Sequence, residues 1–130
     1  MSKFEKIDNS SDNPLAIQIG GSHYKDFEYQ PIEFFMDMRL NFIQCNIVKY
    51  IVRHRLKNGV EDVKKAKHYA EIGVSIDKSI RLGWPSDNSD RFASQVDGDI
   101  EQRIVLSAVR LHYADVIKLC DELIHFYEYE

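Results

Sequence analysis

Residues 41–74 read NFIQCNIVKYIVRHRLKNGVEDVKKAKHYAEIGV, and most of the expected architecture follows from this segment. Apolar residues recur at helical spacing from Phe42 to Leu56 and again from Val63 to Val74. Asn41 is a suitable N-cap for the first helix. Gly59 separates the two helices, because glycine readily adopts the left-handed conformation in which helices end. The sequence therefore predicts a helical hairpin that runs to about Leu82.

Further helices are expected on both sides of the hairpin. Pro31 opens a short helix that ends near Arg39, since proline is tolerated at the first helical position. Residues 99–130 keep a helical period without glycine or proline, which predicts one long C-terminal helix that packs on the core or on a partner subunit. We therefore expect an all-α fold in a single domain, and a homo-oligomer. No internal repeat is evident.

Composition sets the expected domain boundaries. Residues 1–14 are polar and predict a flexible tail, and residues 15–84 form the helical core together with a glycine-rich loop. Residues 85–98 have no sustained period, which predicts a linker or a mobile loop. The sequence predicts neither a secretory signal nor a membrane span.

Charge and cysteine content narrow the classes of function. The 130 residues carry a net charge of −4 with a pI near 5.7, which disfavours nucleic-acid binding through total charge. Cys45 and Cys120 lack the spacing of a zinc site and are too few for a disulfide framework. We expect two buried thiols in a cytosolic protein.

The first helix of the hairpin carries a polar stripe whose members lie three or four residues apart. Its members are Asn46, Lys49, Arg53 and Lys57, and Tyr50 borders it. Arginine binds phosphate oxygens with two hydrogen bonds, and lysine acts as a compact charge. The stripe suits a phosphorylated small molecule. It also fits a solvated helix face whose charges pair with neighbouring acids.

The second helix begins with two adjacent carboxylates, Glu61 and Asp62. Oxygen ligands of this kind can hold Mg²⁺. The same residues can instead stabilise the helix N-terminus and balance nearby lysines. Lys65 and Tyr69 are expected on the same face as Asp62.

Gly20-Gly21-Ser22-His23-Tyr24 forms a loop signal upstream of the helices. Consecutive backbone N–H groups in such a loop can bind an anion. His23 can serve as a general acid or base, as a phosphate ligand, or as a hydrogen-bonded anchor of the loop. Nothing in the sequence matches a P-loop or a zinc signature.

Several of these motifs occur in the order seen in a known family. They are GGSHY (residues 20–24), QPIE (30–33), NIVKYIVR (46–53), KNGVEDVKKA (57–66) and Tyr69. In this order they resemble the SaV-like family of small phage proteins, which includes the T7-type phage nucleotide kinase. The resemblance covers about residues 17–72.

The resemblance implies a phage-encoded protein that binds deoxynucleotides in the cytoplasm of the infected host cell. It implies a nucleoside monophosphate kinase without a P-loop, acting on dTMP and dGMP. His23, Lys49 and Arg53 would then be catalytic, and Glu61 and Asp62 would hold Mg²⁺. The ligand-binding residues would be Gly20, Gly21, Tyr24, Asn46, Lys49, Tyr50, Arg53, Lys57 and Lys65.

Two other functions remain open at this point. The protein can be a non-enzymatic phage effector that binds a host protein or sequesters a nucleotide, with the acidic C-terminal helix as the partner surface. Nucleic-acid binding through the basic hairpin is the weakest hypothesis, because no aromatic residues interleave the cations. Whether the protein is an enzyme is therefore left open.

Overall fold

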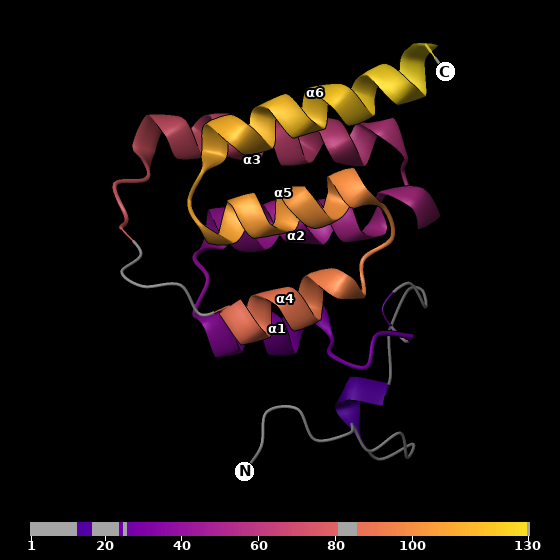
Figure 1. Ribbon diagram of the computed structural model, residues 1–130, viewed down its shortest axis with the longest axis vertical. Helices are drawn as coiled ribbons and strands as arrows, with labels where there is room; N and C mark the ends of the chain where they lie inside the picture. The colour runs from indigo at the N-terminus through magenta and orange to yellow at the C-terminus, as the bar shows by residue number, and fades with distance from the viewer. Residues whose placement is uncertain (1–12, 17–23, 25, 81–85, 130) are drawn as a thin grey trace.

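In the part of the chain that the structure describes, six α-helices lie in three layers (Figure 1). The computed structural model describes residues 13–16, 24, 26–80 and 86–129. The helices are α1 (Pro31–Met38), α2 (Phe42–Arg53), α3 (Val60–Ile76), α4 (Ser86–Ser94), α5 (Asp99–Val109) and α6 (Tyr113–Tyr129). The layers pair α3 with α6, α2 with α5 and α1 with α4. No strand occurs among these residues, so the all-α prediction is confirmed.

The predicted hairpin is present as α2 and α3. Asn41 caps α2 through a capping box, in which its side chain accepts from the N–H of Gln44 at 2.9 Å and the Gln44 side chain accepts from the N–H of Asn41 at 2.9 Å. After Arg53 the chain tightens into a 3-10 turn, η2 (His54–Leu56). Gly59 then takes a positive φ of 58° just before α3.

The short first helix also forms where the sequence predicts it. Pro31 occupies the first turn of α1, behind a capping box made by Gln30 and Glu33. The helix is capped by Arg39, whose left-handed φ of 51° lets the N–H of Leu40 donate back to the carbonyl of Phe35 at 3.1 Å. Another short 3-10 turn, η1 (Pro14–Ala16), covers the end of the predicted tail, while residues 1–12 lie outside the described residues.

The predicted linker at residues 85–98 is wrong, because most of it forms α4. Phe92 and Ala93 are buried, and Val96 is buried just after the helix. The Phe92 ring stacks on Phe34 of α1, with centroids 4.3 Å apart and an interplanar angle of 2°. A helix with so few apolar residues shows no repeated period in the sequence, and it is held in place by tertiary packing.

The prediction of one long C-terminal helix is also wrong. The chain reverses at residues 110–112, between α5 and α6. Leu111 takes a left-handed φ of 65°, and the N–H of His112 donates to the carbonyl of Ser107 at 2.9 Å. The reversal lets both helices bury their apolar faces in one core. Non-glycine residues rarely adopt this conformation, so the sequence carries no turn signal here.

The core lies between the helices of each layer and between the layers. The fully buried side chains include Phe34, Ile47, Val48, Ile51, Val63, Phe92, Ile104, Val105, Val109 and Val116. None of the helices in the described part of the chain has the length and apolar character that a membrane span requires.

Candidate functional site

Basic and aromatic side chains gather across α2 and α3, and we call this group the Tyr50 cluster. Its members are Lys49, Tyr50 and Arg53 on α2, and Lys65 and Tyr69 on α3. The Nζ atoms of Lys49 and Lys65 lie 4.4 and 5.4 Å from the centre of the Tyr50 ring, and Cζ of Arg53 lies 4.6 Å from it. A cation within about 6 Å of a ring centre is attracted by the ring quadrupole. One ring therefore gathers three positive charges.

The helical repeat and the packing of the hairpin explain this arrangement. Lys49 and Arg53 are one helical turn apart, so they lie on the same side of α2. Lys65 and Tyr69 have the same spacing on α3. Because Val48 and Ile51 are fully buried on the core side of α2, the basic side chains remain at the surface.

The two tyrosines form a partly exposed aromatic surface beside the cations. The rings of Tyr50 and Tyr69 lie 6.1 Å apart and nearly parallel, at 19°. The edge of Phe42 packs against Tyr69 at 6.0 Å and 69°, while Phe42 itself is 71% exposed. Planar ligands stack on such surfaces, and stacking tolerates different bases.

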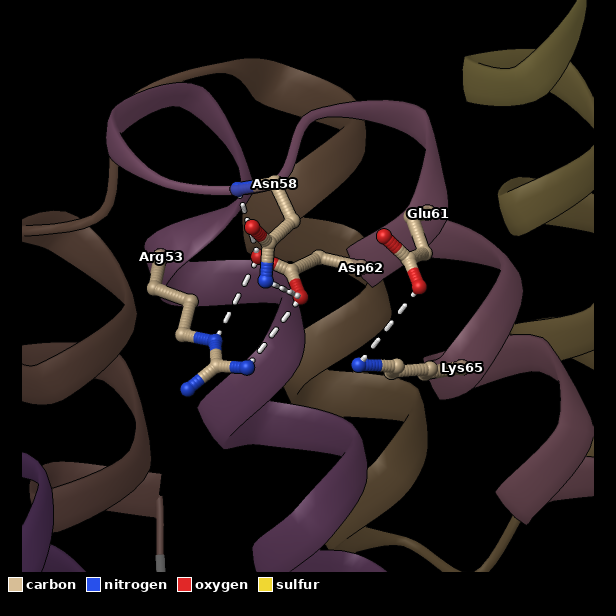
Figure 2. A network of polar contacts seen from close by, with 5 residues as sticks. All are labelled: Arg53, Asn58, Glu61, Asp62 and Lys65. Carbon is tan, nitrogen blue, oxygen red and sulfur yellow. Dashed lines mark hydrogen bonds and ion pairs between the residues drawn. The ribbon is translucent and has the colours of Figure 1, made fainter.

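Asp62 fixes the orientation of Arg53. Its carboxylate is fully buried and accepts from Nε and Nη2 of Arg53, each at 3.3 Å (Figure 2). It also accepts from the backbone N–H of Asn58 at 3.2 Å, which ties the α2–α3 turn to the same group. Asp62 is thus a positioning residue. It holds the Arg53 guanidinium beside the Tyr50 ring.

The structure gives the predicted Mg²⁺ pair other partners. The oxygens of Asp62 already accept from Arg53 and Asn58, and Glu61 faces Lys65 at 3.9 Å (Figure 2). Among the described residues, no three His, Cys, Asp or Glu side chains are grouped to hold a metal ion. Magnesium is commonly held by one or two carboxylates together with water and substrate phosphates. Because Asp62 is buried and already paired, Glu61 is the more accessible carboxylate of the two, and the magnesium site stays a prediction.

Tyr24 is the residue of the predicted glycine-rich loop that the structure describes. Burial raises the pKa of the Tyr24 hydroxyl, the charge of Arg53 lowers it, and Asp62 and Tyr50 raise it further. Charges shift a pKa appreciably when they lie close to the titrating group, which places the Tyr24 hydroxyl near Arg53, Asp62 and Tyr50. Gly20, Gly21 and His23 lie outside the described residues, and their predicted roles stay predictions.

Two members of the predicted polar stripe do not join the cluster. Asn46 is buried and donates from Nδ2 to the carbonyl of Phe42 at 2.8 Å, one turn back along α2. This bond occupies the amide within its own helix. Lys57 is exposed and follows η2, where the tighter 3-10 turn takes the chain out of the α-helical register of the stripe.

The sequence interpretation missed a buried polar network, which we call the Glu101 network. Oε2 of Glu101 lies 2.9 Å from Nε2 of His54 and 2.9 Å from Nε of Arg55. Nδ1 of His54 lies 2.7 Å from the hydroxyl of Tyr127. Burial raises the pKa of Glu101, but the hydrogen bonds from His54 and Arg55 outweigh burial and lower it. A cavity of about 480 Å³ lies beside the network.

A signal for this network does exist in the sequence. Glu101 lies three and four residues before Ile104 and Val105, on the face of α5 that the apolar pattern assigns to the core. A charged residue at such a position needs a buried partner. The partner, His54, is too distant in the sequence to be found by spacing.

A known protein family matches a segment in the first half of the chain. Residues 18–71 match a family described as a protein of unknown function, DUF3310. The DUF3310-like segment contains the whole Tyr50 cluster and ends within α3, so the match does not include α4, α5 or α6. No curated protein and no solved structure matches the chain.

Proposed function

We propose that the Tyr50 cluster binds a nucleotide, with its cations on the phosphate groups and its tyrosine rings against the base. The observation that carries this proposal is the gathering of three cations within 5.4 Å of one ring centre. The Tyr50 ring attracts each cation, but the like charges repel one another. The negative charge of a nucleotide would offset that repulsion, and its base would stack on the tyrosine rings.

The local charge balance supports an anionic ligand. Asp62 neutralises Arg53, and Glu61 is a distant, exposed partner of Lys65. Lys49 contacts the Tyr50 ring and, among the described residues, forms no ion pair within 4 Å. The cluster thus keeps excess positive charge in a chain whose net charge is −4. Such local fields attract phosphates.

The motif resemblance adds a more specific proposal, namely that the protein is a deoxynucleoside monophosphate kinase without a P-loop. Phosphoryl transfer depends mainly on positioning and on stabilising charge. Lys49 and Arg53 can supply both, because Asp62 fixes the Arg53 guanidinium. The phage origin, the location in an infected host and the homo-oligomer remain predictions from the sequence.

Isothermal titration with dTMP, dGMP and their triphosphates, each with and without MgCl₂, tests binding. Lys49→Ala should weaken binding about tenfold or more, because charge-assisted hydrogen bonds contribute about 1.5–3 kcal/mol. Lys118→Ala, which removes an exposed lysine on α6, is the matched control and should leave the affinity unchanged within about twofold. The absence of binding at millimolar ligand would overturn the proposal.

A kinase assay separates the enzyme from a binder that sequesters its ligand. The γ-phosphoryl group of ATP would move to a phosphate oxygen of dTMP, which yields ADP and dTDP. Turnover that falls in Lys49→Ala and persists in Lys118→Ala supports the kinase. Binding without product formation would leave the nucleotide-sequestering protein as the function.

A further inference from the structure

The first and last three helices of the fold have the same design. Helices α1, α2 and α3 contain 8, 12 and 17 residues, and α4, α5 and α6 contain 9, 11 and 17. Each layer pairs one helix from the first unit (α1–α3) with its counterpart from the second unit (α4–α6) (Figure 1). The order of the helices through the layers is therefore the same in both units.

The paired helices run in opposite directions, as a twofold rotation requires. Gln44 in the first turn of α2 donates to the carbonyls of Ala108 and Val109 in the last turn of α5, at 3.0 and 3.1 Å. Reciprocally, Glu101 in the first turn of α5 accepts from His54, directly after α2. Each middle helix thus uses a buried polar side chain at the same position to hold the end of its counterpart.

When the first residues of each pair are aligned, α2 and α5 share several identical residues and α3 and α6 share a few, whereas α1 and α4 share none. For α2 and α5 the identical pairs are Ile43/Ile100, Ile47/Ile104, Val48/Val105, Val52/Val109 and Arg53/Arg110. For α3 and α6 they are Asp62/Asp115, Val63/Val116 and Lys65/Lys118. Most of the matching apolar positions are fully buried in both units.

The same alignment compares the Tyr50 cluster with its counterpart on α5 and α6. Arg53 and Lys65 keep their basic character there as Arg110 and Lys118. The remaining members differ, since Lys49, Tyr50 and Tyr69 correspond to Leu106, Ser107 and Glu122. At the positions that correspond to the Tyr50 cluster, the second unit therefore keeps part of the basic pattern but has no aromatic ring.

We infer that the chain consists of two copies of one three-helix unit, and that Tyr50 and Tyr69 determine the specificity of the first copy for base-bearing phosphates. The second copy is the internal reference, because it keeps two of the cations but not the rings. This inference rests on the proposed nucleotide binding. It goes further by assigning the discrimination between a nucleotide and a bare phosphate to the two rings.

Titrations with dTMP and with inorganic pyrophosphate test the inference. The variants Tyr50→Ser, which copies Ser107, and Tyr69→Gln, an uncharged version of Glu122, remove the rings. Each should weaken dTMP binding about tenfold to hundredfold, the range expected for the loss of base stacking. Pyrophosphate affinity should change less than about threefold. Tyr50→Phe keeps the ring and should restore dTMP affinity.

Both tyrosines are only partly buried, and thermal unfolding of each variant checks that the fold persists. Equal losses for dTMP and pyrophosphate would overturn the specificity role, since the rings would then serve only to position the cations. A parallel loss of dTMP affinity in Lys65→Ala and Lys118→Ala would also overturn it, because both units would then bind the ligand. A binding of pyrophosphate to native protein that is as tight as that of dTMP would overturn the inference but leave anion binding intact.

If neither dTMP nor pyrophosphate binds native protein, the proposed function itself is removed.

Discussion

The α2–α3 and α5–α6 hairpins bury matching apolar positions, but their exposed faces carry different chemistry. Val48 and Val105 are both fully buried, as are Val63 and Val116. On the surface, the aromatic pair of the first hairpin is replaced in the second by Ser107 and a carboxylate. Shared buried positions account for much of the fold, while the rings of Tyr50 and Tyr69, which pack beside the core, have no counterpart in the second hairpin. They are therefore the first residues to examine for function.

The two ends of the middle layer differ in a second way. The amide of Gln44 makes neutral hydrogen bonds to the end of α5, whereas the carboxylate of Glu101 makes charged ones to the end of α2. Burying a charge has a large desolvation penalty that only well-placed partners offset. The end of α5 is thus held by the uncharged Gln44, and the end of α2 by the ionised Glu101.

Replacing Glu101 should have the largest effect on stability. Glu101→Ala leaves the buried His54 without its acceptor and is expected to lower the free energy of unfolding by about 3–5 kcal/mol. Gln44→Ala removes the side-chain donor to the carbonyls of Ala108 and Val109, of which only Ala108 keeps a backbone donor, and should lower it by about 1–3 kcal/mol. Urea denaturation at pH 7 compares the two variants directly.

Glu101→Gln is the control for this comparison, since it keeps the shape of the side chain and removes its charge. Its loss of stability should lie between those of the two alanine variants. If Gln44→Ala destabilises as much as Glu101→Ala, the charged network contributes no more than its neutral counterpart, and the contrast between the two ends fails.

The caps of the two middle helices give a prediction of intermediate size. Asn41 caps α2 with its side chain, whereas Gly98 precedes α5 with a φ of 99°. A Cβ at residue 98 would lie 2.0 Å from Oε1 of Glu101. Gly98→Asn should therefore lower the free energy of unfolding by about 1–3 kcal/mol, although asparagine is normally a favourable cap. A higher urea midpoint for this variant would contradict the prediction.

The smallest expected effect concerns Asp77, which follows α3 and contacts the start of α6. Burial raises the pKa of Asp77, but hydrogen bonds from Ser79, Tyr113 and Asn41 outweigh burial and lower it from 3.8 to about 2. A lowered pKa in the folded state means that this stabilisation is complete above pH 3.8 and is lost as the pH falls toward 2. Asp77 is partly exposed, so solvent screening keeps the contribution small.

Urea midpoints measured between pH 5 and 2 test this sign. The difference in stability between native protein and Asp77→Asn should shrink as the pH falls toward 2. Because Glu101 also has a lowered pKa, only the difference between the two proteins isolates Asp77. A difference that stays constant over this range would show that the ionised Asp77 adds nothing.

The sequence predicted the parts of the fold that local rules govern. The N-cap at Asn41 and the placement of Pro31 in the first turn of α1 follow from neighbouring residues alone. The sequence did not predict α4 or the chain reversal at Leu111, because packing against distant helices decides the conformation there. The repeat was missed because the loops between counterpart helices differ in length and most identities lie at buried apolar positions, where many helices look alike.

The candidate site was predicted in part for the same reason. Helical spacing placed Lys49 and Arg53 on one face of α2, and this is how they lie. The same spacing also suggested Asn46, whose amide turns back onto its own helix. Spacing along one helix says nothing of the Asp62 contact with Arg53, which depends on the geometry of the α2–α3 turn.

The pairing of one helix from each unit in every layer has a consequence for synthesis on the ribosome. The first unit emerges before α5, which packs on α2, so the burial of Ile47, Val48 and Ile51 is still incomplete at that stage. At about 5–20 residues per second, the remaining chain takes several seconds to be translated. During that interval the nascent polypeptide exposes apolar surface of the kind that favours aggregation until α5 is in place.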